Sequence, residues 1–469
     1  MRLARVINNS VALLSLDLLN KAIPFVVFPL VVRALGPAVY GQLGFAGAVA
    51  GFFGLLASPG FTVYALREAA KDPGQVPFLV RHVVGARMVF GVGAFAALAI
   101  FAFLWSPNTG QTRTLILLSG LAFVISSLDI QWIFAARSRM WVIAGRGAVS
   151  QLAYAGLILA LVRRSSDAWI IPTATLVSLG LTTLLLWLPA RRQYHVPLPM
   201  ISPQTWRFFL PMCLTIGFAS LMSMIYDQID TVMLKYFRPD AEVGLYVAAY
   251  GLMTAALSFL PILGQVFWPL LSESAGRVAD DEKKYLRWLG HATVGLALPI
   301  AVGGFILAVP LTNLVLGTQY SGSGTLFRWL MLTVLAGPAA SYFGAQLIPN
   351  GREKKYLTAV LFGALANIAL NLALIPRYGA IAAALTTAFS QSVVALLNYY
   401  FARDLPQPSL LGPLALSLPA TVLMAIGLLA VHRAYSLPVV VLILCGAVFY
   451  GSAYTIGVLL RNRTSLSVT

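Results

Sequence analysis

Four polar side chains follow one face of an otherwise apolar segment between residues 220 and 250. Ser220, Ser223, Asp227 and Asp230 recur at steps of three and four residues, the spacing that places side chains on one face of a helix. A carboxylate inside an apolar segment is costly unless it faces water or a partner. The pattern therefore predicts a functional charge site. The alternative is that both acids lie close enough to the end of the segment, before Lys235, to be solvated.

Further charges lie inside the first apolar run. Asp17 and Lys21 are four residues apart, so they can pair on one face of a helix. Pro24 and Pro29 remove backbone hydrogen bonds from the same run and predict a bend. A bent, charged first helix is typical of a moving gate, and a structural ion pair inside the bundle is the alternative.

The third to fifth apolar runs also contain charged or polar residues that are candidates for a functional site: Arg87, Asp129, Gln131 and Arg146. Arg87 can either reach the inner surface through its long stem or line a cavity, and the sequence favours neither. Arg146 shares a face with polar residues at four-residue spacing, which predicts that it points inward rather than at lipid. Asp129 and Gln131 end the fourth run, just before a basic turn.

Amide side chains recur in two later runs. Asn367 and Asn371 share a face of one run, and Gln391 lies in the next. Amides commonly join membrane helices by hydrogen bonds. They can also line a wet vestibule that suits sugar hydroxyls.

The composition predicts an all-α polytopic membrane protein. Hydrophobic residues make up 59% of the 469 residues and charged residues 10%, with a mean hydropathy of +0.84. A spanning helix needs about 20 apolar residues. About fourteen runs meet that requirement, near 11–32, 41–63, 83–104, 114–136, 141–162, 168–189, 208–234, 244–269, 287–310, 325–349, 356–376, 380–402, 411–431 and 437–460.

Two stretches about 202 residues apart repeat the same order of residues. PLVVRALGPAVYGQL, from Pro29, and TVMLKYFRPDAEVGLY, from Thr231, each carry one basic residue, Arg33 or Lys235, then a Pro-containing turn and a Gly that opens the next run. The segment from Gln346 to Arg352 likewise occupies the place of Gln131 to Arg137. We therefore expect two six-helix lobes around a central cavity. The expected boundaries are 1–190 and 208–403 for the lobes, 191–207 for a basic cytoplasmic linker and 404–469 for two appended helices.

The net charge of +17 is distributed as expected for membrane topology rather than for nucleic-acid binding. With the N-terminus inside, 21 of the 32 Lys and Arg residues fall in tails and loops on the cytoplasmic side, and nine on the opposite side. Both termini are thus predicted to be cytoplasmic.

The sequence offers no evidence of catalysis. No connecting loop exceeds about 20 residues, which leaves no room for a soluble catalytic domain. There is no GxxxxGK[ST] phosphate loop, and the four histidines and two cysteines have no metal-binding spacing. We expect no metal, no cofactor and no enzymatic activity.

Several short motifs resemble one family. RALGPAVYGQL, VGLYVAAY, DIQWIFAARSRM and IDTVMLKYF, together with twelve helices plus two, resemble the Wzx-type polysaccharide flippases of the multidrug/oligosaccharidyl-lipid/polysaccharide (MOP) exporter superfamily over essentially the whole chain. The chain departs from the related lipid II flippases, because its first run lacks a dense arginine cluster and has only Lys21 and the more distant Arg33.

The resemblance implies a function. Such flippases move undecaprenyl-diphosphate-linked oligosaccharides across the bacterial inner membrane by alternating access, beside membrane lipids and alongside a polysaccharide polymerase and a chain-length regulator. Lys21, Arg87 and Arg146 would then bind the diphosphate, with Arg33 and Lys235 at the outer turns and Gln131, Asn367, Asn371 and Gln391 facing the glycan. Asp17, Asp129, Asp227 and Asp230 would pair with these bases or carry a coupling ion.

Two other functions remain open. A multidrug cation exporter of the same superfamily would share the fold but favour acidic and aromatic cavity residues. An O-antigen polymerase or ligase would be an enzyme, and such enzymes usually need a long periplasmic loop, which this sequence lacks.

Overall fold

In the computed structural model, all regular secondary structure of the described part of the chain is helical. The structure describes residues 2–104, 110–194, 196–258, 267, 271, 279–405, 410–435 and 437–466. The side chains of residues 2–22, 279–282 and 462–466, and of Ala219, Ser223 and Tyr226, lie outside the described part. The chain divides into two compact units, Met1–Gly244 and Leu245–Thr469.

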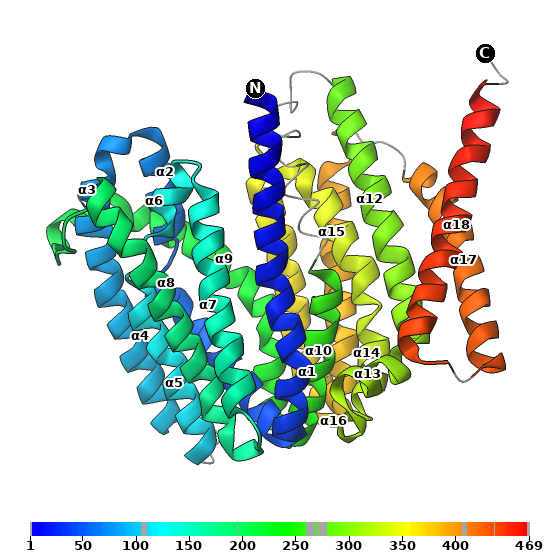
Figure 1. The fold of residues 1–469 in the computed structure, drawn as a ribbon, viewed down its shortest axis with the longest axis horizontal. Coiled ribbons are helices and arrows are strands. Elements are labelled where there is room, and N and C mark those ends of the chain that lie inside the picture. The colour runs from blue at the N-terminus through cyan, green and yellow to red at the C-terminus, as the bar shows by residue number, and fades with distance from the viewer. Residues whose placement is uncertain are drawn as a thin grey trace. The chain divides into compact units, whose positions relative to one another are not determined.

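The first unit is a bundle of long helices. It contains α1 (Arg2–Ala57), α2 (Phe61–Lys71), α3 (Val76–Leu79), α4 (Gly85–Leu104), α5 (Gly110–Ser126), α6 (Gln131–Ala136), α7 (Met140–Leu161), α8 (Ile170–Tyr194) and α9 (Pro203–Phe237). Helices α4, α5, α7 and α8 run alongside one another, and the short helices α2, α3 and α6 gather at one end of the unit (Figure 1).

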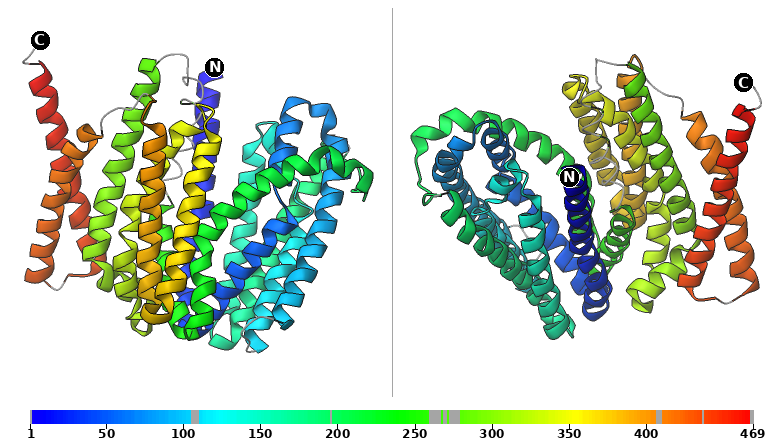
Figure 2. Two further views of the ribbon diagram at one scale, coloured as in Figure 1. Left: turned by 180° about the vertical axis from the view of Figure 1, so that it is seen from behind. Right: turned by 45° about the horizontal axis from the view of Figure 1, so that its top comes forward.

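The second unit begins inside α10 (Asp240–Leu257). Its later helices are α12 (Ala279–Ile306), α13 (Ala308–Leu316), α14 (Ser323–Leu330), α15 (Thr333–Leu347), α16 (Glu353–Ala402), α17 (Leu411–Ala434) and α18 (Val439–Leu466). Helices α17 and α18 pack as a pair, with α17 against α12 (Figure 2). Tyr450 of α18 donates a hydrogen bond to the carbonyl of Gly295 in α12, at 2.7 Å.

Ten segments of the described chain are long and apolar enough to cross a membrane. Two of them are longer than one crossing: residues 23–57 and the 50 residues 353–402. Each bends at a glycine with positive φ, Gly36 (φ 72°) and Gly379 (φ 59°), close to Pro37 and Pro376 respectively. The breaks fall between the predicted runs 11–32 and 41–63, and at the boundary of 356–376 and 380–402, so each long helix supplies two crossings.

The boundary between the two compact units lies later than the predicted linker. Helix α9, the first helix of the expected second lobe, packs on α1 and α2 and belongs to the first unit. The predicted division of the chain by internal repeats therefore stays a prediction: lobes at 1–190 and 208–403, a linker at 191–207 and appended helices at 404–469.

Candidate functional site

Arg87 is buried in the first unit and anchors the end of a broken helix. Its Nη1 donates to the carbonyl of Asp129 at 2.9 Å and its Nη2 to that of Ser126 at 2.6 Å. The side chain is 4% exposed, so it does not reach the surface as the snorkelling alternative required. Because both terminal nitrogens bind carbonyls that the helix break leaves open, the geometry favours a structural role over diphosphate binding.

The residues around this break complete the same network. Helix α5 ends at Ser126 and α6 begins at Gln131, whose backbone N–H donates to Oδ1 of Asp129 at 3.0 Å. Trp187 of α8 donates from Nε1 to the carbonyl of Leu128 at 2.7 Å. Asp129 and Gln131 thus take part in the same helix junction as Arg87. Their predicted roles, charge pairing or ion coupling for Asp129 and glycan binding for Gln131, stay predictions.

Arg146 has a different environment. It lies two turns inside α7, is half-buried and donates to the carbonyl of Val142 at 3.3 Å. Its guanidinium carbon lies 5.9 Å from the centroid of the Phe134 ring. Within the described part of the chain, no carboxylate lies within ion-pair distance of Arg146. A half-buried cation without a counter-ion, inside a spanning segment, is what an anionic substrate requires.

Lys235 lies where the two repeated turns cross. It forms an ion pair with Asp240, the first residue of α10, and Oδ2 of Asp240 also accepts a hydrogen bond from Gln42 at 2.7 Å. Lys235 thus neutralises Asp240 within one turn, and Asp240 joins the two turns through its hydrogen bond with Gln42. Neither Asp240 nor Gln42 was singled out by the sequence analysis.

The same crossing brings the two repeats into backbone contact. A Cβ atom on Gly41 would lie 2.1 Å from the carbonyl oxygen of Asp240, and one on Gly244 would lie 1.8 Å from that of Pro37. Only glycine permits this approach. The two residues that open the next run in each repeat, Gly41 and Gly244, therefore pack on each other's turn.

The remaining predicted acids and bases of this unit are spread out. On the α9 stripe, Asp227 is exposed whereas Asp230 is buried. Arg33 is exposed, three residues before the Gly36 bend. The side chains of Asp17 and Lys21 lie outside the described residues, so their pairing and their contact with substrate stay predictions.

The amides of the second unit form a buried network. Asn371 donates to Oδ1 of Asn367 at 3.0 Å and accepts a hydrogen bond from Thr386, which comes from the other arm of α16. Both asparagines are fully buried. This arrangement fits the helix-joining alternative. Gln391 is half-buried, and its Oε1 lies 3.7 Å from the position that a Cβ on Gly337 would take.

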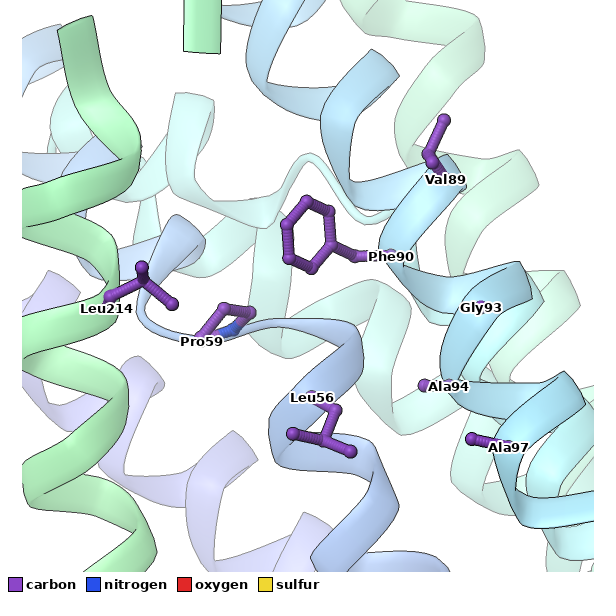
Figure 3. Close-up of a pocket in the computed structure, with 8 residues that line it drawn as sticks. All are labelled: Leu56, Pro59, Val89, Phe90, Gly93, Ala94, Ala97 and Leu214. Carbon is purple, nitrogen blue, oxygen red and sulfur yellow. The ribbon is translucent and has the colours of Figure 1, made fainter. Parts of the chain in front are cut away.

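A cavity of about 370 Å³ in the first unit is apolar (Figure 3). Its walls come from the end of α1, from α4 and from α9, and Figure 3 shows Leu56, Pro59, Phe90 and Leu214 around the space. The lining offers no donor or charge to a sugar or a diphosphate, so this cavity is not a site for the polar part of a substrate.

Comparison with solved structures identifies the fold. The chain shares its fold with the lipid II flippase MurJ in an inward closed conformation, at a TM-score of 0.73 and 13% identity, over 95% of this chain and 98% of that one. A multidrug resistance MATE family transporter of the MOP superfamily in an inward-facing conformation matches at a TM-score of 0.59 and 16% identity, over 82% and 94%. The fold is therefore that of MOP superfamily transporters, as predicted.

Sequence comparison then gives the family. The model of the polysaccharide biosynthesis protein family matches residues 6–275, more than half of the chain, and the chain belongs to this family. A protein from Shigella dysenteriae named as a candidate O-antigen transporter is 22% identical over 400 residues, covering 80% of this chain and 95% of the relative. The capsular polysaccharide biosynthesis protein CapF of Staphylococcus aureus is 26% identical over 192 residues, 40% of this chain and 47% of that one.

Proposed function

We propose that this protein is a flippase that moves undecaprenyl-diphosphate-linked polysaccharide repeat units from the cytoplasmic to the periplasmic leaflet by alternating access. Family membership supports handling of a polysaccharide precursor, and the Shigella relative supports an O-antigen unit as the cargo. Such a precursor carries a diphosphate and sugar hydroxyls that cannot cross hydrocarbon unaided.

The observation that carries the proposal is the charge of Arg146. Among the described residues this cation has no carboxylate partner, and it lies inside a spanning helix. It is matched to an anionic lipid diphosphate, because a guanidinium binds phosphate oxygens through two parallel hydrogen bonds. We assign the diphosphate to Arg146 together with Lys21. Arg87 is left out, because its nitrogens already bind carbonyls.

The test uses a strain that lacks this gene. Its undecaprenyl-linked intermediates are isolated and their leaflet is determined with a membrane-impermeant glycosidase. We expect complete repeat units to accumulate facing the cytoplasm, and to clear on expression of the wild type but not of Arg146→Gln. Arg433→Gln, which removes an exposed arginine at the end of α17, serves as the matched control and should restore transport.

Two outcomes would reject the proposal. Clearance by Arg146→Gln at the wild-type rate would remove the diphosphate assignment. An unchanged lipid-linked pool together with energised export of cationic dyes would favour the multidrug exporter, whose fold this chain shares.

A further inference from the structure

A second arginine site lies at one end of the first unit, in the turn between α6 and α7. Arg137 and Arg139 flank Ser138 in the turn between α6 and α7, and with Pro73, Gly74, Gln193 and Tyr194 they line a cavity of about 650 Å³. The turn is rigid, since the N–H of Ser138 donates to Ala135 and that of Arg139 to Phe134, the pattern that closes a helix with a left-handed residue (Ser138, φ 53°).

The two arginines are held toward the cavity but not neutralised. The guanidinium carbon of Arg137 lies 4.5 Å from the centroid of the Tyr194 ring, and Arg139 donates to Oε1 of Gln193 at 2.8 Å. In the described part of the chain, neither has a carboxylate within ion-pair distance. Asp72, next to the lining residue Pro73, accepts the N–H of Gly74 instead.

The second unit contains a turn with the same backbone hydrogen bonds, but its arginine is paired with a carboxylate. There the N–H of Gly351 (φ 70°) donates to Ile348 and that of Arg352 to Leu347, so Arg352 is the counterpart of Arg139, not of Arg137 as the sequence alignment predicted. Arg352 is paired with Asp404, whereas Arg139 meets the neutral amide of Gln193. One copy of the turn is closed by an internal anion, and the other is left open for an external one.

The position of the cavity indicates where that anion comes from. Helix α7 enters its apolar segment at Met140, directly after Arg139, and Trp141 is 63% exposed. An exposed tryptophan at the start of a spanning helix is typical of the headgroup level of a bilayer. The cavity therefore lies at the depth of lipid phosphates.

We propose that this cavity binds the phosphate of an anionic membrane lipid, one whose headgroup carries a net negative charge, through Arg137 and Arg139. The lining of this cavity does not include Arg146, to which we assign the transported diphosphate. Two guanidinium groups on a fixed turn, with Tyr194 stacked against Arg137, suit the oxygens of a phosphate ester.

The test measures lipid binding rather than transport. The purified full chain in neutral detergent is titrated with phosphatidylglycerol or phosphatidylcholine, and bound lipid is counted by native mass spectrometry. We expect the wild type to prefer phosphatidylglycerol at least about tenfold, and the doubly substituted Arg137→Gln, Arg139→Gln protein to lose this preference. Arg192→Gln, which removes one positive charge outside the lining, should keep it within about twofold.

A second variant keeps the test decisive if the double substitution does not fold. Gln193→Glu places a carboxylate on Arg139, as Asp404 does on Arg352, and should abolish the preference while leaving the melting temperature unchanged or higher. Competition by undecaprenyl diphosphate distinguishes the source: displacement of phosphatidylglycerol assigns the cavity to the substrate lipid as well, and retention assigns it to bulk phospholipid. Equal affinity for both phospholipids, or an equal loss in Arg192→Gln, would overturn the proposal.

Discussion

Arg352 and Asp404 form a two-point ion pair across the two ends of α16. Nη1 lies 2.9 Å from Oδ1 and Nη2 lies 2.8 Å from Oδ2, and Nη1 also donates to the carbonyl of Phe401 at 2.8 Å. Arg352 precedes the helix and Asp404 follows it, so the bend at Gly379 must fold its 50 residues into two antiparallel arms. The pair closes the open end of this hairpin.

The ion pair predicts a pH dependence of stability. The hydrogen bond from Arg352 lowers the pKa of Asp404 from 3.8 to about 2. Because the folded-state pKa is depressed, the stabilisation is complete above about pH 4 and is lost as the pH falls toward about 2. We expect Asp404→Asn to lower the melting temperature in detergent at neutral pH, and the difference from the wild type to vanish near pH 2. A difference that persists unchanged at low pH would contradict the assignment.

The close approach at the repeat crossing predicts that two glycines are irreplaceable. Gly41→Ala or Gly244→Ala drives a methyl group into backbone atoms, which cannot move aside as side chains can, and we expect a loss of about 2 kcal/mol or more in unfolding free energy. Gly47→Ala, in the same helix, meets nothing within 4 Å and should be neutral or stabilising by up to about 1 kcal/mol. The measurement is the unfolding free energy of the three variants by chemical unfolding in one detergent. Equal changes in all three would mean that the turns are not packed as described.

The ion pair of Lys235 and Asp240 should couple energetically. The side chain of Lys235 is only 7% exposed, so the loss of its partner leaves a charge in an apolar setting. A double-mutant cycle with Lys235→Met and Asp240→Asn should give a coupling of about 1 kcal/mol or more. The neighbouring pair Arg238 and Glu242, at 4.0 Å and more exposed, is the matched control and should give about 0.5 kcal/mol or less.

The fold was largely predictable from the sequence, because the lipid environment demands long apolar runs and permits few alternatives. The partners of the charged side chains could not be predicted from the sequence. Lys235 and Asp240 are five residues apart across a turn, and Gln42 and Asp240 are 198 apart, so no helical spacing relates them. Arg87 illustrates the same limit, since its partners are backbone carbonyls, which every residue carries. The echo between the turns at Gly41 and Gly244 was the one available signal of their contact.

The asparagine network predicts a cost for an isosteric change. Thr386→Val removes the hydroxyl that donates to Asn371 and leaves a buried amide oxygen with one partner fewer, which should cost about 1–2 kcal/mol. Thr421→Val is the control, because that buried hydroxyl donates to the carbonyl of Ser417 in its own helix. Its effect should be clearly smaller, as measured by thermal unfolding of both variants. Equal losses would mean that the bond between the two arms of α16 adds nothing to stability.

Arg87 and Arg146 should separate stability from transport. Arg87→Lys keeps the charge but cannot span two carbonyls with one flat group, so we expect a lower melting temperature and less protein in the membrane, with transport per molecule nearly unchanged. Arg146→Gln should do the opposite: normal abundance and melting temperature, with transport reduced at least about tenfold, because its charge has no carboxylate to stabilise within the described residues. The measurement is the rate of clearance of lipid-linked units, normalised to the amount of folded protein. If instead Arg87→Lys abolished transport per molecule at normal stability, Arg87 would belong with the substrate and not with the α5–α6 junction.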